Sequence, residues 1–218
     1  MDTSTLSSTE LVDSRIGFIG RTYGMLALCI AAGSVGAYAS LGMVFPLAHP
    51  WLTLFMMMGG IFVVQAVRHT PIINLIALLG FGALTGFAIS PLVGLVAAKS
   101  GMLVAQAFMT TAVAFVGLTA YTFISRRDFS FMRGFLWMGL IAVVVLGLSN
   151  IFFHSATMAL MLSGISVLLF SAYILYDTSN ILRNYPNDEY ISAALTLYLD
   201  VFLLFENLLV LFGMLDDK

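Results

Sequence analysis

Long stretches without a charged side chain are the strongest constraint on how this chain can fold. Ordinary soluble domains carry about a quarter charged residues, whereas only 9% of these 218 residues are charged. Such stretches exceed the core of a soluble domain, so they indicate a polytopic membrane protein built from α-helices. A transmembrane β-barrel would instead show short alternating segments. The charge-free stretches cover residues 22–67, 69–98, 100–125 and 134–176.

The apolar sequence divides into seven predicted transmembrane helices, so the expected fold is all-α. We interpret residues 23–214 as a single transmembrane domain, residues 1–22 as a short polar N-terminal arm, and residues 215–218 as an acidic tail. The second span is the shortest, and if it were re-entrant only six spans would remain. The predicted spans are residues 23–45, 51–67, 72–97, 102–124, 134–153, 157–182 and 191–214.

The distribution of basic residues predicts the orientation in the membrane, because loops rich in arginine and lysine stay in the cytoplasm. With seven spans, the side that holds the N-terminus carries seven arginines, and the other side carries Lys99 and Lys218. We therefore expect the N-terminus in the cytoplasm and the C-terminus outside. The loop 124–134 is the most basic stretch, and we expect it at the level of anionic lipid headgroups. The arginines are Arg15, Arg21, Arg68, Arg126, Arg127, Arg133 and Arg183.

A small residue recurs at every fourth position of the third predicted span. Gly82, Gly86, Ser90 and Gly94 leave one helix face with almost no side chain, so another backbone can approach it closely. Pro91 lies in the same helix and is expected to kink it. The pattern predicts tight helix packing, and a hinge against which a neighbouring helix moves is the alternative interpretation.

Two aspartates lie inside the last two apolar spans, Asp177 in ILYDTSNIL and Asp200 in LYLDVFLLF. A carboxyl group at membrane depth costs at least a few kcal/mol, so such residues usually have a function. The two spans are consecutive, and the depths of the aspartates differ by only about 6 Å at 1.5 Å per residue. We therefore expect the two side chains to meet in the cytoplasmic half of the bundle.

Other polar residues follow the same helix faces. Tyr173 and Asn180 share a stripe with Asp177 at i, i+4, i+7 spacing, and Asn207 shares one with Asp200. Glu206 lies about 120° from Asp200 around the axis of the last helix, and it is nearer the outer face of the membrane. The pattern indicates a water-accessible seam through the interior of the bundle.

The aspartate pair has four interpretations from its residues alone. Two protonated carboxyl groups can cross-link helices by hydrogen bonds. They can also share one proton and thereby sense pH, or bind a cation through oxygen ligands when ionised. Carboxylates without histidine or cysteine favour Ca²⁺, Mg²⁺, Na⁺ or H⁺ over zinc or copper, and the three histidines are too scattered for a fixed metal site. Facing aspartates would also suit an intramembrane aspartyl protease.

Four stretches of the chain resemble the Bax-inhibitor family, the transmembrane Bax-inhibitor-motif proteins. The resemblance covers nearly the whole chain, and the short N-terminal arm is similar to that of the bacterial branch. The matching stretches are GFAISPL (86–92), RRDFSF (126–131), FSAYILYDTSNI (170–181) and LYLDVFLLFENLLVLFG (197–213).

The resemblance implies a bundle in which six helices wrap around a central C-terminal helix, and a pH-sensitive calcium leak across the bacterial inner membrane. It implies that Asp177 and Asp200 are the proton-sensing pair, with Ca²⁺ bound transiently as the transported ion. Arg68 is the candidate for an arginine latch onto the first aspartate. The alternative is a regulatory protein that binds other membrane proteins, such as a membrane AAA protease. We expect no enzymatic activity, cofactor or nucleic-acid partner.

Overall fold

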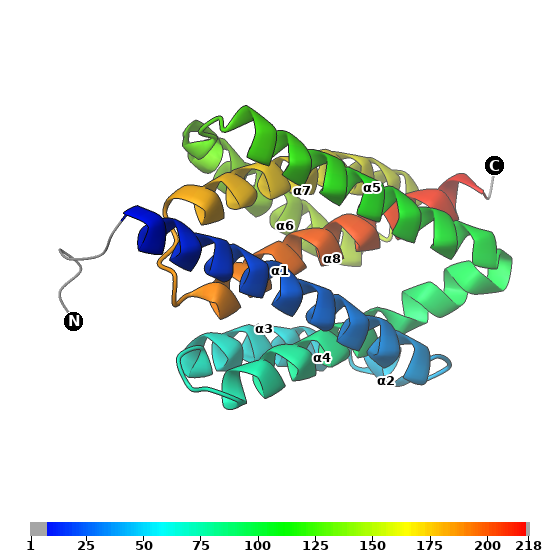
Figure 1. The fold of residues 1–218 in the computed structure, drawn as a ribbon. Coiled ribbons are helices and arrows are strands. Elements are labelled where there is room, and N and C mark those ends of the chain that lie inside the picture. The colour runs from blue at the N-terminus through cyan, green and yellow to red at the C-terminus, as the bar shows by residue number, and fades with distance from the viewer. Residues whose placement is uncertain (1–7, 217–218) are drawn as a thin grey trace.

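The computed structural model describes residues 8–216, and every secondary-structure element in that range is helical. Seven of these helices are long and apolar enough to cross a membrane, which confirms the predicted number of spans. They lie side by side as one bundle (Figure 1). The elements are α1 (Ser8–Ala39), α2 (Phe45–Ala48), α3 (Pro50–Val67), α4 (Ile73–Lys99), α5 (Gly101–Ser125), η2 (Ser130–Met132), α6 (Arg133–Phe153), α7 (Ala156–Arg183) and α8 (Tyr190–Leu215).

Six of the predicted spans agree with the observed helices to within two residues, but the first does not. Helix α1 begins at Ser8 and ends at Ala39, whereas the prediction was residues 23–45. Residues 8–22 therefore belong to this helix, and only residues 1–7 of the predicted arm lie outside the described part. Residues 217 and 218 of the acidic tail also lie outside it.

The early start of α1 has a physical reason in its contacts with the rest of the bundle. The Arg15 guanidinium donates to the carbonyl oxygen of Tyr185 at 2.6 Å and of Ile181 at 2.5 Å, in and before the loop between α7 and α8. Phe18 is buried one turn further on. The helix ends early because the chain turns at Gly42, whose φ of 84° favours glycine.

Helices α1 and α4 pack backbone against backbone, which is what the stripe of small residues predicts. A Cβ at Gly82 would lie 2.6 Å from the carbonyl oxygen of Cys29 in α1. The Ser90 hydroxyl lies 3.1 Å from the carbonyl oxygen of Ser40. Gly94 differs from the rest of the stripe, because a Cβ there would meet only the Leu41 side chain at 3.9 Å.

Helix α4 continues through Pro91, which has no amide hydrogen for the carbonyl group of Phe87. The Ser90 hydroxyl lies 2.9 Å from that carbonyl oxygen and can donate to it. The preceding serine thus offers an alternative donor at the point where proline removes one.

Helix α8 has the most buried positions of the bundle and packs against α1, α3, α4, α5 and α7. Helix α6 packs mainly against α7 and presents most of its large apolar side chains outward. The predicted arrangement of six helices around a central C-terminal one is therefore not confirmed, since α6 lies outside α7. In a membrane the outward face of α6 contacts lipid.

Candidate functional site

The structure brings Asp177 of α7 and Asp200 of α8 together inside the bundle. Their carboxyl groups lie within reach of each other, and the two side chains are only 7% and 5% exposed. Carboxylates are acceptors only, so a hydrogen bond between the two groups would require one of them to carry a proton. No amide or hydroxyl group of the described residues donates to Asp200 Oδ2. The pair is therefore a buried site of two neighbouring carboxyl groups.

Two tyrosines lie near the aspartate pair. Tyr173 lies one turn before Asp177 on α7, close enough for both carboxyl groups to act on it electrostatically. Tyr185 belongs to the α7–α8 loop, and its hydroxyl lies 3.3 Å from that of Thr196. Burial raises the pKa of the Tyr185 phenol, the hydrogen bond to Thr196 lowers it, and the charges of both aspartates raise it further. The loop thus places an aromatic ring near the pair.

The other polar residues predicted to line a seam have local partners or lie further along α8. Asn180 accepts a hydrogen bond from Asn184 at 2.8 Å. Asn207 donates to the carbonyl oxygen of Leu203 at 2.7 Å, within its own helix. Glu206 is half-buried on α8 beyond Asp200. Of the predicted supporting residues, Tyr173 is the one that the structure places beside the pair.

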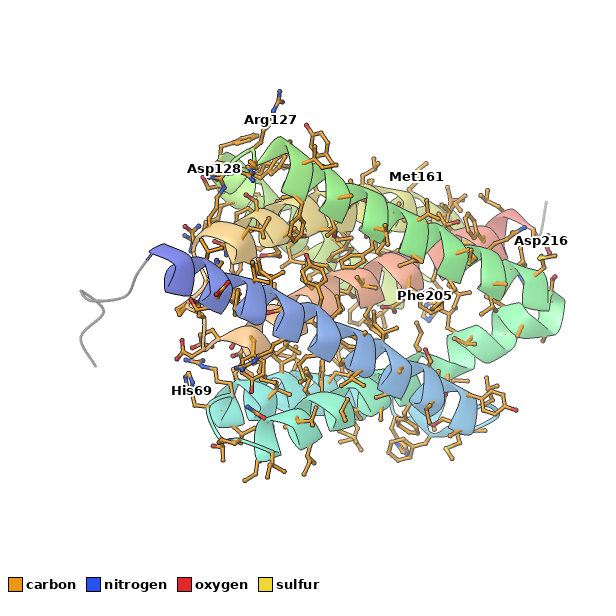
Figure 2. All side chains as sticks on the ribbon, in the orientation of Figure 1. His69, Arg127, Asp128, Met161, Phe205 and Asp216 are labelled. Atoms are coloured by element: carbon orange, nitrogen blue, oxygen red, sulfur yellow. The ribbon has the colours of Figure 1, made fainter. Side chains whose placement is uncertain are left out.

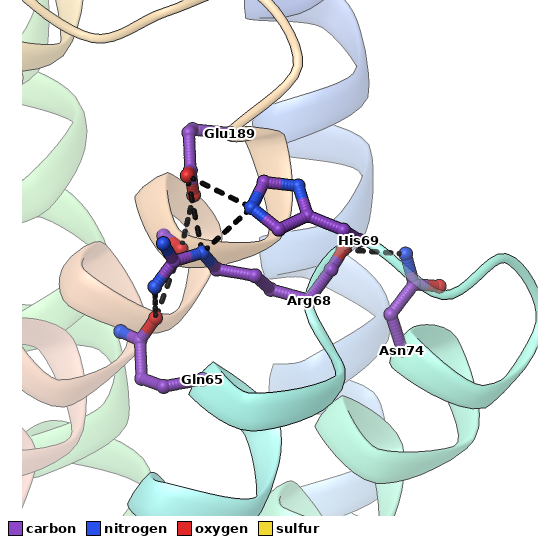
Figure 3. A network of polar contacts seen from close by, with 6 residues as sticks. Gln65, Arg68, His69, Asn74 and Glu189 are labelled. Atoms are coloured by element: carbon purple, nitrogen blue, oxygen red, sulfur yellow. Dashed lines mark hydrogen bonds and ion pairs between the residues drawn. The ribbon is translucent and has the colours of Figure 1, made fainter.

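Arg68 lies in a different network from the one that the resemblance implies. Its Nε forms an ion pair with Glu189 Oε1 at 3.0 Å, and His69 Nε2 lies 3.4 Å from the same oxygen. Ser192 donates to Glu189 Oε2 at 2.7 Å and also lies 3.0 Å from Gln65 Oε1 (Figure 3). This network ties the end of α3 to the start of α8, and in this structure the Arg68 partner is Glu189 rather than Asp177.

The fold assembles two clusters of polar side chains that were not predicted from the sequence. One is the Glu189 network, in which residues far apart in the chain meet. The other lies between α1, α5 and α7, where the Tyr23 hydroxyl faces Thr119 and Thr178. The one signal for Glu189 in the sequence was its position, since it is a charged residue just before the last predicted span. Nothing in the spacing of the three hydroxyl residues indicated that they would converge.

The described residues contain no group of three or more histidine, cysteine, aspartate or glutamate side chains that could hold a metal ion. Calcium sites in proteins supply about six to eight oxygen ligands, and the aspartate pair supplies four carboxyl oxygens. The pair alone therefore supplies fewer oxygen ligands than a typical calcium site.

Comparison with known proteins gives one family match and several relatives. The family model described as "Inhibitor of apoptosis-promoting Bax1" matches residues 15–217. A membrane protein of Vibrio cholerae is 36% identical over 202 residues, covering 90% of this chain and 89% of the relative. The mouse protein lifeguard 4 is 33% identical over 214 residues, covering 95% and 89%. A Golgi anti-apoptotic protein of vaccinia virus is 34% identical over the same length, with the same coverage.

Proposed function

The chain belongs to the Bax inhibitor family of membrane proteins, and on that premise we propose that it is a pH-sensitive calcium leak channel. The observation that supports the proposal is the buried pair of neighbouring carboxyl groups, Asp177 and Asp200, inside the bundle. An ionisable group at membrane depth that faces the interior of a bundle is typical of ion and proton pathways. We place the protein in the bacterial inner membrane with its N-terminus in the cytoplasm.

The proposed mechanism follows from the charge states of the pair. With one shared proton, the hydrogen bond holds α7 and α8 together near the cytoplasmic end. When that proton leaves, two carboxylates at hydrogen-bonding distance repel each other or recruit a cation. Each charge state thus favours a different arrangement of the two helices, and the proportion of the two depends on pH.

Calcium flux into proteoliposomes tests the proposal. We expect the flux through the wild-type protein to change between about pH 6 and pH 8, where a strongly coupled carboxyl pair titrates. Asp177→Asn and Asp200→Asn should each flatten this dependence, because a lone carboxyl group has no partner with which to share a proton. Asp13→Asn is the matched control, since that carboxyl group is exposed near the start of α1. A flat wild-type response, or a full response in either variant, would refute the proposal.

A second candidate is a regulatory protein that acts by binding other membrane proteins, such as a membrane AAA protease. The observation that favours it is the anti-apoptotic name of the viral relative, which describes regulation rather than transport. In that case the aspartate pair would be a structural link between α7 and α8. The same liposome experiment separates the two candidates, because only a channel requires flux in the absence of a partner protein.

A further inference from the structure

The loop between α5 and α6 gathers positive charge at one end of the bundle. Three arginines belong to the loop region, and Arg183 at the end of α7 lies close enough to act electrostatically on Asp128 of the loop. The four arginines and this one aspartate carry a net charge of +3. The loop arginines Arg126, Arg127 and Arg133 are all exposed. Arg127 projects away from the helices beside the end of α5 (Figure 2). The patch therefore presents guanidinium groups outward.

The backbone of this loop is held in one conformation by α7. The Ser179 hydroxyl donates to the carbonyl oxygen of Arg127 at 3.1 Å and accepts from the amide of Phe129 at 3.4 Å. The Arg183 guanidinium donates to the carbonyl oxygen of Arg126. Phe129 is buried, with its ring 6.3 Å from that of Tyr121. The exposed arginines thus extend from a fixed backbone, which reduces the entropy lost when they bind a ligand.

Large apolar side chains surround the arginines on the outside of the bundle. Ile124 is 84% exposed and Phe131 is 79% exposed, and both flank the loop directly. Phe135 and Trp137 are exposed on the first turns of α6. Aromatic residues beside basic ones at the end of a transmembrane helix are typical of the level where headgroups meet acyl chains. The patch therefore combines groups that suit both parts of a lipid.

We propose that Arg126, Arg127 and Arg133 form a binding site for the phosphate group of an anionic phospholipid, with Phe131 against its acyl chains. Guanidinium groups bind phosphate oxygens in pairs through parallel N–H donors. Each basic residue near an anionic membrane surface strengthens binding by about fivefold. The phosphate belongs to a lipid rather than to a soluble anion, because the patch lies at the end of the spans.

The site is attached to the helix that carries Asp177. Ser179, which holds the loop, follows that aspartate by two residues, and Arg183 follows it by six. A bound lipid would therefore restrain the end of α7 near the aspartate pair. If the proposed function holds, this restraint predicts that anionic lipid shifts the pH dependence of calcium flux. The binding site itself is tested without flux.

Native mass spectrometry of the purified full chain, released from nanodiscs of mixed phosphatidylcholine and phosphatidylglycerol, measures the proposed preference. We expect the wild-type protein to retain phosphatidylglycerol preferentially. Arg127→Gln combined with Arg133→Gln should weaken that preference by about 25-fold at fivefold per arginine. The matched control combines Arg21→Gln with Arg68→Gln, which removes the same charge from the same end of the bundle and should leave most of the preference intact.

Three outcomes would overturn the proposal. The first is an equal loss of preference in the two double variants, which would indicate general electrostatic attraction. The second is displacement of the lipid by millimolar inorganic phosphate, which would indicate a site for a soluble anion. The third is an unchanged preference in Ser179→Ala, which keeps every charge but releases the loop. If the glutamine variant fails to fold, Arg127→Lys with Arg133→Lys replaces it and should lose part of the preference.

Discussion

Replacing Gly86 by alanine should separate α1 from α4. A Cβ at Gly86 would lie 2.7 Å from the amide nitrogen of Ala37 and 2.9 Å from the carbonyl carbon of Gly33, with the Gly33 oxygen nearer still. All three atoms belong to the α1 backbone, so no side chain can rotate out of the way. The helices must move apart along an interface where each was in direct contact with the other.

The expected magnitude follows from the packing. Overfilling a well-packed interior costs about 1–3 kcal/mol, and more where the neighbours cannot move. For a chain of this length, each kcal/mol lowers the melting temperature by about 2–4 °C. We therefore expect Gly86→Ala to lower it by between about 2 and 12 °C.

Thermal unfolding of the purified protein in nanodiscs, followed by tryptophan fluorescence, measures this change. Gly80→Ala is the matched control, because it lies in the same helix and a Cβ there would meet nothing within 4 Å. It should leave the melting temperature unchanged or raise it, since alanine favours a helix over glycine by about 1 kcal/mol. Equal melting temperatures for the two variants would refute the close approach of α1 and α4.

Three further predictions concern the orientation and the polar loops. Cysteine labelling at both ends of the chain should place the N-terminus in the cytoplasm and the C-terminus outside, and labelling of both from one side would contradict the orientation. Glu189→Gln should broaden the distance distribution between spin labels at Ala66 and Asp188, because it removes the ion pair with Arg68; Asp13→Asn is the control, and an unchanged distribution would show that the pair does not hold α3. The Ser130 amide donates to Asp128 and holds the pKa of that carboxyl group below its usual value. Its stabilisation of the loop is therefore present at neutral pH and lost as the pH falls through the lowered pKa, so the Ser130 amide NMR shift should change at acidic pH in the wild type and not in Asp128→Asn.

Much of the fold could be predicted from local sequence properties. The charge-free stretches determined seven spans, because a membrane accepts only long apolar helices that satisfy their own backbone. Six of these spans were located to within two residues. The stripe around Gly86 determined that α4 would pack closely against another backbone. Hydropathy, small-residue spacing and charge all act over one or two helical turns, which is why the sequence reveals them directly.

The candidate site was predictable in part for the same reason. Asp177 and Asp200 stood out because a carboxyl group is costly inside any apolar span, and their similar predicted depths on consecutive helices follow from the helical rise. Asn180 and Asn207 share the faces of the aspartates, but Asn180 accepts from Asn184 just past the end of α7 and Asn207 donates to a carbonyl group of its own helix. A shared stripe shows which face of a helix the side chains occupy. It does not show which neighbouring group each side chain will bind.

The tertiary structure alone decided which distant residues became partners. Arg68 could reach more than one acidic group from the end of α3, and the packing of α8 placed Glu189 there. Arg15 looked like part of a polar arm, yet it binds the α7–α8 loop across 170 residues of sequence, and this contact holds the first turns of α1 against the bundle. Such pairings depend on how whole helices lie against one another, because hydrogen bonds and ion pairs act over a few ångströms in space regardless of separation along the chain.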